Sequence, residues 1–381
     1  MHLTRRNLLF GLGAAAAATA AAPVLLTTEP LLGSAATKAA ARSTTPEGLI
    51  LLSRNENAYG PFASVQQAMR DSLVRANRYT FAPDYSALVD RITRLHGVDR
   101  QSVIVGAGST ELLRMAADAF TGPDKRLITG DPTFEAIGGY ASNRGAQVVR
   151  VPLTSSYAHD LEGMLRAARE GTSGGLFYIC NPNNPTATIT PSSELSEFVR
   201  QIPAGYMLLL DEAYHHFAEG VAGYAPVQAA ANVIVTRTFS KVFGLAGIRL
   251  GYGVSTPETI QKLQPWQLDN NVNTVAAQCG AIALEDTAST RAAARRIVND
   301  RAEFMKQAAA RNVKVIPSFT NFAMMQTGKP ARQVIDYFRT RNIQIGRPFP
   351  PMLDHVRISF GTPDEMRQFW QAWDGMAANH G

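Results

Sequence analysis

Cysteine is scarce in this sequence, with two residues in 381. Cys180 and Cys279 match no metal-ligand spacing, which argues against a cysteine-based zinc site. Two thiols in a chain of this length are more often buried and free than bridged. We therefore expect two free cysteines in a fold that depends on its hydrophobic core.

Charge is also sparse, since 18% of the residues are charged and the formal net charge is +6. Half of that excess lies in residues 1–42, where four basic residues stand against one acidic residue, Glu29. The remaining charge is too small to indicate nucleic-acid binding, and no basic stripe with interleaved aromatic residues occurs. Hydrophobic residues make up 45% of the chain, which is long enough for two domains.

A long apolar run occurs at the N-terminus. The sequence TRRNLL at residues 4–9 is typical of a twin-arginine signal, and an alanine-rich stretch follows it. Residues 8–26 are long enough to span a membrane, so an uncleaved anchor is the alternative to a cleaved signal. Small-residue cleavage sites favour cleavage. We predict that residues 1–45 are a signal peptide and linker. The signal would direct the protein through the twin-arginine export machinery to the periplasm or cell envelope.

Short apolar strands alternate with helices between residues 103 and 254, which is typical of a mostly parallel sheet covered on both faces. The predicted strands are residues 49–52, 103–105, 127–128, 147–151, 176–179, 207–210 and 233–236. Beyond residue 265 we predict a smaller α+β unit with helices at residues 274–285, 289–310 and 331–339 and strands at residues 313–316, 322–325 and 355–360. The fold class is therefore α/β, with a three-layer large domain and a smaller α+β domain.

Polar residues follow several of these strands where the strands end. The turn GAGST at residues 106–110 leads into a helix, so its backbone N–H groups and the helix dipole favour a phosphate. A plain helix cap at Ser109 or Thr110 is compatible with this interpretation. Asp211 follows a wholly apolar strand, where a buried carboxylate needs a cationic partner or serves as a helix cap.

Lys241 follows the strand at residues 233–236, within the motif TFSK. Ligands of α/β folds bind at such strand ends. A partly desolvated lysine has a lowered pKa, and its neutral amine can form a Schiff base with an aldehyde. Taken alone, the residue is more often an ordinary loop lysine.

Five separated motifs together resemble the fold-type I pyridoxal-phosphate aminotransferases of class I/II, and most closely their histidinol-phosphate aminotransferase branch. The motifs are SRNENAYGP, GAGSTELL, NPNNPT, DEAY and TFSK with a downstream arginine. The resemblance implies a homodimer that binds pyridoxal 5'-phosphate. It also implies an N-terminal arm and small-domain segment at residues 46–62, a large cofactor-binding domain at residues 63–264 and a small domain at residues 265–381.

The resemblance implies a role for each matching residue. Lys241 holds the cofactor aldehyde and then moves a proton, Asp211 keeps the pyridine nitrogen protonated, and Asn184 and Tyr214 bind the phenolic oxygen. Phe134 stacks on the ring. The phosphate is held by Gly108, Ser109, Thr110, Thr238, Ser240, Arg249 and, from a second subunit, Tyr79.

For the substrate, the resemblance implies Arg357 at the α-carboxylate or, in a histidinol-phosphate enzyme, at the phosphate. Asn57, Tyr59 and Arg347 complete the expected substrate-binding residues. The apolar residues 349–351 suit an aromatic or imidazole side chain. We expect transfer of an amino group from histidinol phosphate or an aromatic amino acid to a 2-oxo acid such as 2-oxoglutarate.

Two other functions are compatible with the same motifs. A decarboxylase resembling threonine-phosphate decarboxylase would share every cofactor residue. A non-catalytic cofactor-binding protein is a third possibility, although Lys241 and Asp211 argue against it. The sequence departs from the family at Ala187, where relatives have glycine. The predicted export signal is a second departure, since histidine biosynthesis is normally cytoplasmic.

Overall fold

The structure is a computed structural model that describes residues 48–171, 174–225 and 231–378. The predicted signal peptide and linker, residues 1–45, lie outside these residues. Within the described part of the chain, no helix combines the length and the apolar character needed to cross a membrane.

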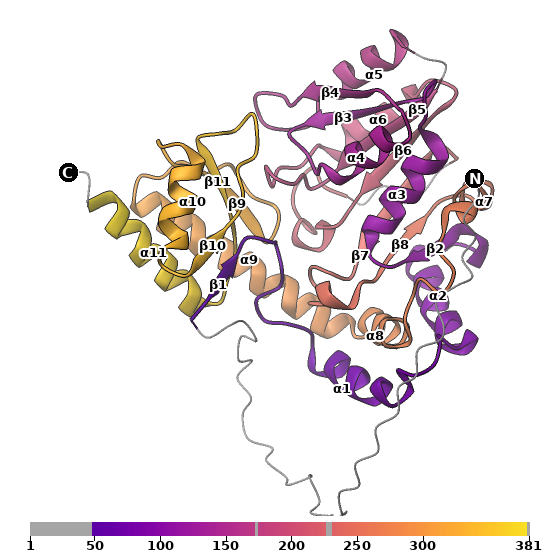
Figure 1. Cartoon of the computed structure of the whole chain (residues 1–381), viewed down its shortest axis with the longest axis horizontal. Coiled ribbons are helices and arrows are strands. Elements are labelled where there is room, and N and C mark those ends of the chain that lie inside the picture. Colours follow the sequence, from indigo (N-terminus) through magenta and orange to yellow (C-terminus); the bar gives the residue numbers. More distant parts are fainter. Residues whose placement is uncertain (1–47, 172–173, 226–230, 379–381) are drawn as a thin grey trace, which may run out of the picture. The chain divides into compact units, whose positions relative to one another are not determined.

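A seven-stranded sheet forms the centre of the fold (Figure 1). Its strand order is β2-β8-β7-β6-β5-β3-β4, and only β8 runs antiparallel to its neighbours. The strands are β2 (Val103–Gly106), β3 (Arg126–Asp131), β4 (Val148–Pro152), β5 (Gly175–Cys180), β6 (Tyr206–Asp211), β7 (Val233–Thr238) and β8 (Gly251–Val254). The predicted mostly parallel sheet is confirmed.

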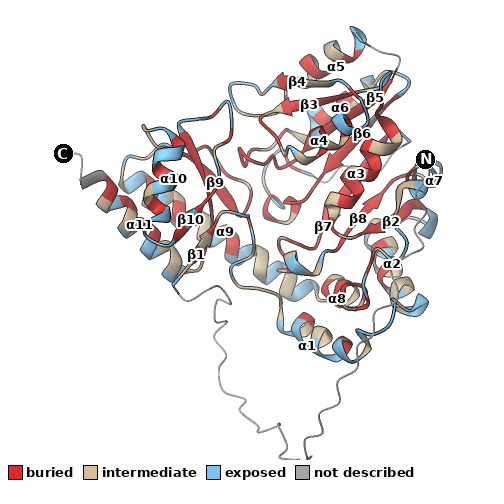
Figure 2. Ribbon diagram, viewed as in Figure 1, coloured by how far each residue is buried: buried red, intermediate tan, exposed pale blue. Residues whose placement is uncertain are grey.

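Both faces of this sheet are buried, because successive side chains along each strand enter different hydrophobic clusters. Ile128, Phe177 and Leu208 pack with α5 (Leu161–Arg169) and α6 (Ser192–Gln201). Leu127, Leu176 and Leu209 belong to the larger cluster, which includes residues of α3 (Ser109–Phe120). Figure 2 shows the strands and α3 as mostly buried. The predicted three-layer arrangement of helix, sheet and helix is therefore confirmed.

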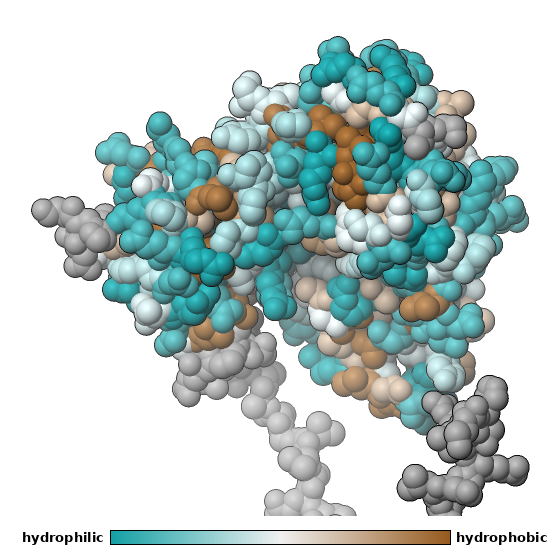
Figure 3. Space-filling model, turned by 45° about the horizontal axis from the view of Figure 1, so that its top comes forward, coloured by the Kyte–Doolittle hydropathy of each residue, from teal (hydrophilic) through white to brown (hydrophobic). Residues whose placement is uncertain are grey.

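Further helices and turns complete the part of the fold around the sheet. They are α1 (Ala63–Ser72), η1 (Leu73–Arg75), α2 (Ala82–His96), η2 (Arg100–Ser102), α4 (Ala136–Asn143), η3 (His215–Phe217), η4 (Ala246–Ile248), α7 (Pro257–Leu263), η5 (Gln264–Trp266) and α8 (Thr274–Glu285). Helix α8 packs against α1 and α2. On the face shown in Figure 3 the surface is mostly hydrophilic, with hydrophobic residues in separate patches.

The C-terminal part joins two small sheets to three helices. Helix α9 (Thr287–Ala310) leads into it, and α10 (Ala331–Arg339) and α11 (Pro363–Ala378) complete it. Strand β9 (Phe322–Gln326) pairs antiparallel with β11 (His355–Ser359). Strand β1 (Ile50–Leu52) pairs in parallel with β10 (Ile343–Ile345), so the N-terminal segment belongs to this part of the fold.

The prediction of a regular strand at residues 313–316 was wrong. Val315 forms only an isolated bridge with Met325, flanked by hydrogen bonds from Ile316 N to Met324 O and from Gln326 N to Lys314 O. The segment thus follows β9 without repeating the regular ladder. Strand β10 and helix α11 were not predicted, although the remaining C-terminal elements were.

Candidate active site

A cavity of about 990 Å³ opens where the carboxyl ends of the sheet strands face the segment after β1 together with α10, β10 and β11. Parallel strands of α/β folds bring their ends together at such a crevice. Among the predicted site residues, those that line the cavity are Ser109, Thr110, Phe134, Asn184, Asp211, Tyr214, Thr238, Ser240, Lys241, Arg249, Arg347 and Arg357. Residues more than 240 positions apart in the sequence therefore meet at one site.

Lys241 lies three residues beyond the end of β7. Its Nζ donates a long hydrogen bond of 3.4 Å to the carbonyl oxygen of Arg54 and lies 5.6 Å from the centre of the Tyr214 ring. Desolvation, followed by the positive charge of Arg357, lowers the pKa of this lysine to about 8. A substantial fraction of the amine is therefore neutral near physiological pH and can act as a nucleophile or base.

Asp211 is the last residue of β6 and is buried. The hydroxyl of Tyr178 donates to its Oδ2 at 3.0 Å, while Oδ1 has no hydrogen-bond partner in the described part of the chain. Burial raises the pKa of this carboxyl to about 6, against the opposing effect of the Tyr178 hydrogen bond. An unpartnered buried carboxylate oxygen is costly, so a cationic donor placed beside Oδ1 would relieve the site.

An anion cradle lies at the N-terminus of α3. Its N-cap is Gly108, which has φ +83° and no side chain that could cap the first N–H groups of the helix. A Cβ atom at Gly108 would lie 2.1 Å from Arg249 Nη2, so glycine is required for the close approach of that guanidinium. Arg249 Nη1 also lies 3.5 Å from the hydroxyl of Ser240, which accepts a hydrogen bond from Thr238 Oγ1 at 3.0 Å. The helix dipole, hydroxyls and guanidinium together suit a phosphate dianion.

Tyr214 and Asn184 are buried beside Asp211. The Tyr214 hydroxyl accepts a hydrogen bond from Asn55 Nδ2 at 3.1 Å, which leaves its own proton for another acceptor. Burial raises the pKa of this phenol, so it is protonated at neutral pH. Phe134 is partly buried at the cavity wall and offers an aromatic face.

Arg357 projects from β11 and is almost fully buried. Its Nη1 donates to Asn184 Oδ1 at 2.5 Å and its Nη2 to Ser53 O at 2.7 Å. Within residues 48–171, 174–225 and 231–378, its Nε has no hydrogen-bond partner. The guanidinium lies 4.6 Å from the centre of the Phe349 ring. Desolvation lowers its pKa to about 10, so it stays charged at neutral pH. A buried cation without a carboxylate partner is suited to an anionic substrate group.

Arg347 lies nearer the cavity mouth. Its Nη2 forms an ion pair with Glu135 Oε2 at 2.5 Å, and both side chains are about half exposed. The guanidinium also lies 4.4 Å from the centre of the Phe349 ring. The ion pair joins the C-terminal part to the residue that follows Phe134, and sequence analysis did not identify Glu135.

Four predicted site residues do not line the cavity. Gly108 acts through its backbone, as described above. Asn57 Nδ2 donates to Val242 O at 2.9 Å, and the Tyr59 hydroxyl donates to Asp300 at 3.0 Å. These contacts hold the N-terminal segment against the fold. Tyr79 is 79% exposed, so a role for it requires a second subunit.

Tyr178 was not predicted as a site residue, because the sequence of its strand is typical of a uniformly hydrophobic core strand. The one available signal was a tyrosine in an otherwise apolar buried run, since a buried phenol needs a partner for its hydroxyl. The register of β5 against β6 supplies that partner, and register cannot be read from one strand alone.

The model of the family described as "Aminotransferase class I and II" matches residues 47–372. A histidinol-phosphate aminotransferase of Symbiobacterium thermophilum is 33% identical over 85% of this chain and 89% of its own length. An aromatic amino acid aminotransferase of Cutibacterium acnes is 37% identical, over 74% of this chain and 80% of its own. The crystal structure of histidinol-phosphate aminotransferase from Sinorhizobium meliloti in complex with pyridoxal-5'-phosphate superposes with a TM-score of 0.79 and 28% identity, covering 85% of this chain and 89% of that chain.

Proposed function

Because the chain belongs to the aminotransferase class I and II family, we propose that it exchanges an amino group between an amino donor and a 2-oxo acid, with pyridoxal 5'-phosphate as cofactor. The observation that carries the proposal is the meeting of a lysine with a lowered pKa and an unpartnered buried carboxylate oxygen in one cavity. Incubation with an amino acid and 2-oxoglutarate should yield glutamate. Release of carbon dioxide without glutamate would instead identify a decarboxylase.

The residues of the cavity fit this cofactor. When bound, pyridoxal phosphate supplies an aldehyde that takes up the amino group and a ring that accepts electrons from the substrate Cα. Oδ1 of Asp211 is free to accept a hydrogen bond from a protonated ring nitrogen, and the cradle at Gly108 and Arg249 suits the phosphate. Tyr214 can donate its hydroxyl proton to a ring oxygen.

Lys241 has two tasks. Its neutral amine would hold the cofactor through the aldehyde, and the same amine, when not so engaged, would carry a proton at the substrate Cα. The lowered pKa serves both tasks, because an amine with a pKa near 8 can lose and regain a proton close to neutral pH. Arg357 meanwhile holds an anionic group of the substrate and so fixes which bond at Cα faces the lysine.

For the substrate we propose histidinol phosphate or an aromatic amino acid as the amino donor. Arg357 and Arg347 both lie against the ring of Phe349, so two cations border one apolar wall. Two guanidinium groups suit a phosphate, whereas one suffices for an α-carboxylate. The names of the relatives from Symbiobacterium thermophilum and Cutibacterium acnes support both donors.

Arg347→Ala should distinguish these donors. We expect kcat/KM to fall more for histidinol phosphate than for phenylalanine, because only the first substrate loses a phosphate contact. The loss of transition-state stabilisation should be about 2 kcal/mol larger for histidinol phosphate. Arg341→Ala, which removes an exposed arginine outside the cavity, is the matched control. An equal loss for both substrates would remove the phosphate role of Arg347, and a wild-type preference for alanine would overturn the donor ranking.

We also propose that the protein is exported in the folded state through the twin-arginine route. The support is the motif TRRNLL followed by an alanine-rich run. Replacing Arg5 and Arg6 together by lysine should keep the protein in the cytoplasm, as fractionation and immunoblotting would show. The control variant Lys38→Arg with Arg42→Lys should leave export unchanged, and equal export of all three proteins would contradict the proposal.

A homodimer is the third part of the proposal. Tyr79 lies near three exposed apolar residues of the same segment, Leu73, Val74 and Phe81. Such a group of apolar side chains is unfavourable in water unless a partner covers it. A second copy would cover it and bring Tyr79 toward a phosphate cradle, and the mass in solution would show the dimer.

A further inference from the structure

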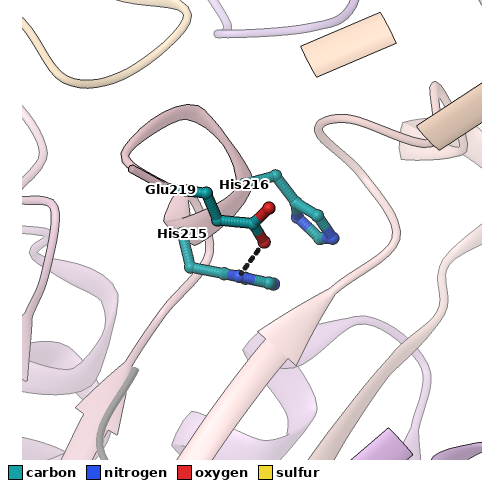
Figure 4. Close-up of side chains that lie close together, drawn as sticks. All are labelled: His215, His216 and Glu219. Atoms are coloured by element: carbon teal, nitrogen blue, oxygen red, sulfur yellow. Dashed lines mark ion pairs between the residues drawn. The ribbon is translucent and has the colours of Figure 1, made fainter. Parts of the chain in front are cut away.

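A second group of polar side chains lies in the turn that follows β6. His215 and His216 belong to η3, and Glu219 follows two residues after its end (Figure 4). The candidate ligand atoms of the three residues all lie within 4.8 Å of one another. His215 Nδ1 is 3.5 Å from Glu219 Oε1. None of the three residues lines the cavity described above.

His215 is the feature that needs an explanation. Its side chain is 6% exposed, and neither ring nitrogen has a hydrogen-bond partner among the residues that the structure describes. Its ring centre lies 3.7 Å from that of His216, and the His216 ring makes a T-shaped contact with Phe243 at 5.2 Å between ring centres. Buried imidazoles normally satisfy both nitrogens with protein, water or a metal ion. The Glu219 carboxylate, whose Oε1 is 3.5 Å from Nδ1, belongs to a class of groups that bind metal ions.

We propose that His215, His216 and Glu219 bind a divalent transition-metal ion of the class of Zn²⁺. Three atoms within 4.8 Å of one another share a point no more than about 2.8 Å from each, whereas bonds from zinc to nitrogen or oxygen measure about 2.0–2.2 Å. Side-chain movements of less than about 1 Å therefore complete the coordination. Two imidazoles and one carboxylate favour zinc and its neighbours over magnesium or calcium, which prefer oxygen ligands.

The surroundings are compatible with a bound cation. Arg237 is the positive group near His215, but it donates hydrogen bonds of 3.0 and 2.9 Å to Glu212, so its charge is countered. Glu219 is half exposed, which gives an ion access from solvent and leaves a position for water.

The position of the cluster indicates what the ion would do. Residue 215 directly follows Tyr214, and the carbonyl of Phe217 accepts a hydrogen bond from Arg301 of α9 at 3.1 Å. An ion would fix this turn between the cavity wall and the long helix. Its expected effect is therefore on stability, and the proposal does not depend on the amino-transfer reaction.

The test uses the full-length, tag-free holoenzyme, freed of metal with a chelator and titrated calorimetrically with ZnCl₂ in a non-phosphate buffer. We expect one Zn²⁺ per chain and a higher Tm in its presence. Glu219→Gln and His216→Gln should each weaken binding at least about tenfold and abolish the rise in Tm. Glu303→Gln, which removes a carboxylate of similar exposure on α9, should change neither quantity.

Because the Glu219 side chain is half exposed, its replacement leaves the core intact, and loss of binding in that variant cannot be ascribed to unfolding. Absence of zinc binding in the wild-type protein would overturn the proposal. Equal affinity in the wild type, Glu219→Gln and His216→Gln would also overturn it, because the zinc would then lie elsewhere.

Discussion

Lys241→Ala is expected to lower the rate of amino transfer by more than about 10⁴-fold. The substitution removes the amine that would hold the cofactor and that would also carry the proton, and a positioned acid–base group alone contributes about 10²–10⁴-fold. Borohydride treatment should attach pyridoxal phosphate covalently to the wild-type protein and not to the variant. The measurements are steady-state turnover and the mass of the reduced protein.

Lys262→Ala is the matched control, because Lys262 is an exposed lysine of α7 outside the cavity. It should retain both turnover and covalent labelling. Near-normal turnover of Lys241→Ala, or covalent labelling at another lysine, would contradict the assignment of Lys241 and with it the proposed function.

Asp211→Asn is expected to act in opposite directions on stability and activity. In the cofactor-free protein it removes a buried carboxylate whose Oδ1 has no partner, so folding should become more favourable at neutral pH. In the holoenzyme the amide cannot hold a proton on the ring nitrogen, so turnover should fall by about 10²–10³-fold and cofactor affinity should weaken. A stabilised but inactive variant distinguishes a functional carboxylate from a structural helix cap.

The effect on stability depends on pH, and its sign follows from the raised pKa. Burial raises the pKa of Asp211 from 3.8 to about 6 in the folded protein. Between these values the folded state retains a proton that the unfolded state has released, so the contribution of this group to stability falls as the pH rises. Above pH 6 the cost is about 2–3 kcal/mol, and below pH 4 it disappears.

Thermal unfolding of the cofactor-free protein should therefore show a higher Tm for Asp211→Asn at pH 7.5 and little difference near pH 4. Asp364→Asn removes an exposed carboxylate and should show no such dependence. If Asp211→Asn is no more stable than the wild type at pH 7.5, Oδ1 has a partner in solution. Normal turnover would mean that Asp211 is only a cap.

The sequence predicted the elements whose pattern is local. Strands β5 and β6 are continuous apolar runs, and α10 has regular helical spacing, so each was found within a few residues of its bounds. Residues 313–316, Val-Lys-Val-Ile, were also predicted as a strand. Their pairing depends on a partner ten residues away, and only one bridge forms. Strand β10 is three residues long, and its strand conformation depends on pairing with β1.

The same distinction applies to the site. Lys241, Asp211 and Arg249 lie at strand ends or in turns with recognisable motifs, and all three reach the cavity. The contacts between Tyr178 and Asp211 and between Arg347 and Glu135 were not predicted. They join residues 33 and 212 positions apart, and they follow from strand register and from the meeting of the C-terminal part with the sheet.

The pairing of β1 with β10 has a consequence for how the chain is made. Ile50 pairs with Ile343, so the ribosome must add nearly 300 residues before β1 can meet its partner. At 5–20 residues per second this takes about 15–60 s, during which an apolar strand near the start of the chain has an open edge. The cavity wall formed by residues 53–56 is equally incomplete over that time. A nascent chain therefore cannot hold its cofactor in a finished site before translation ends.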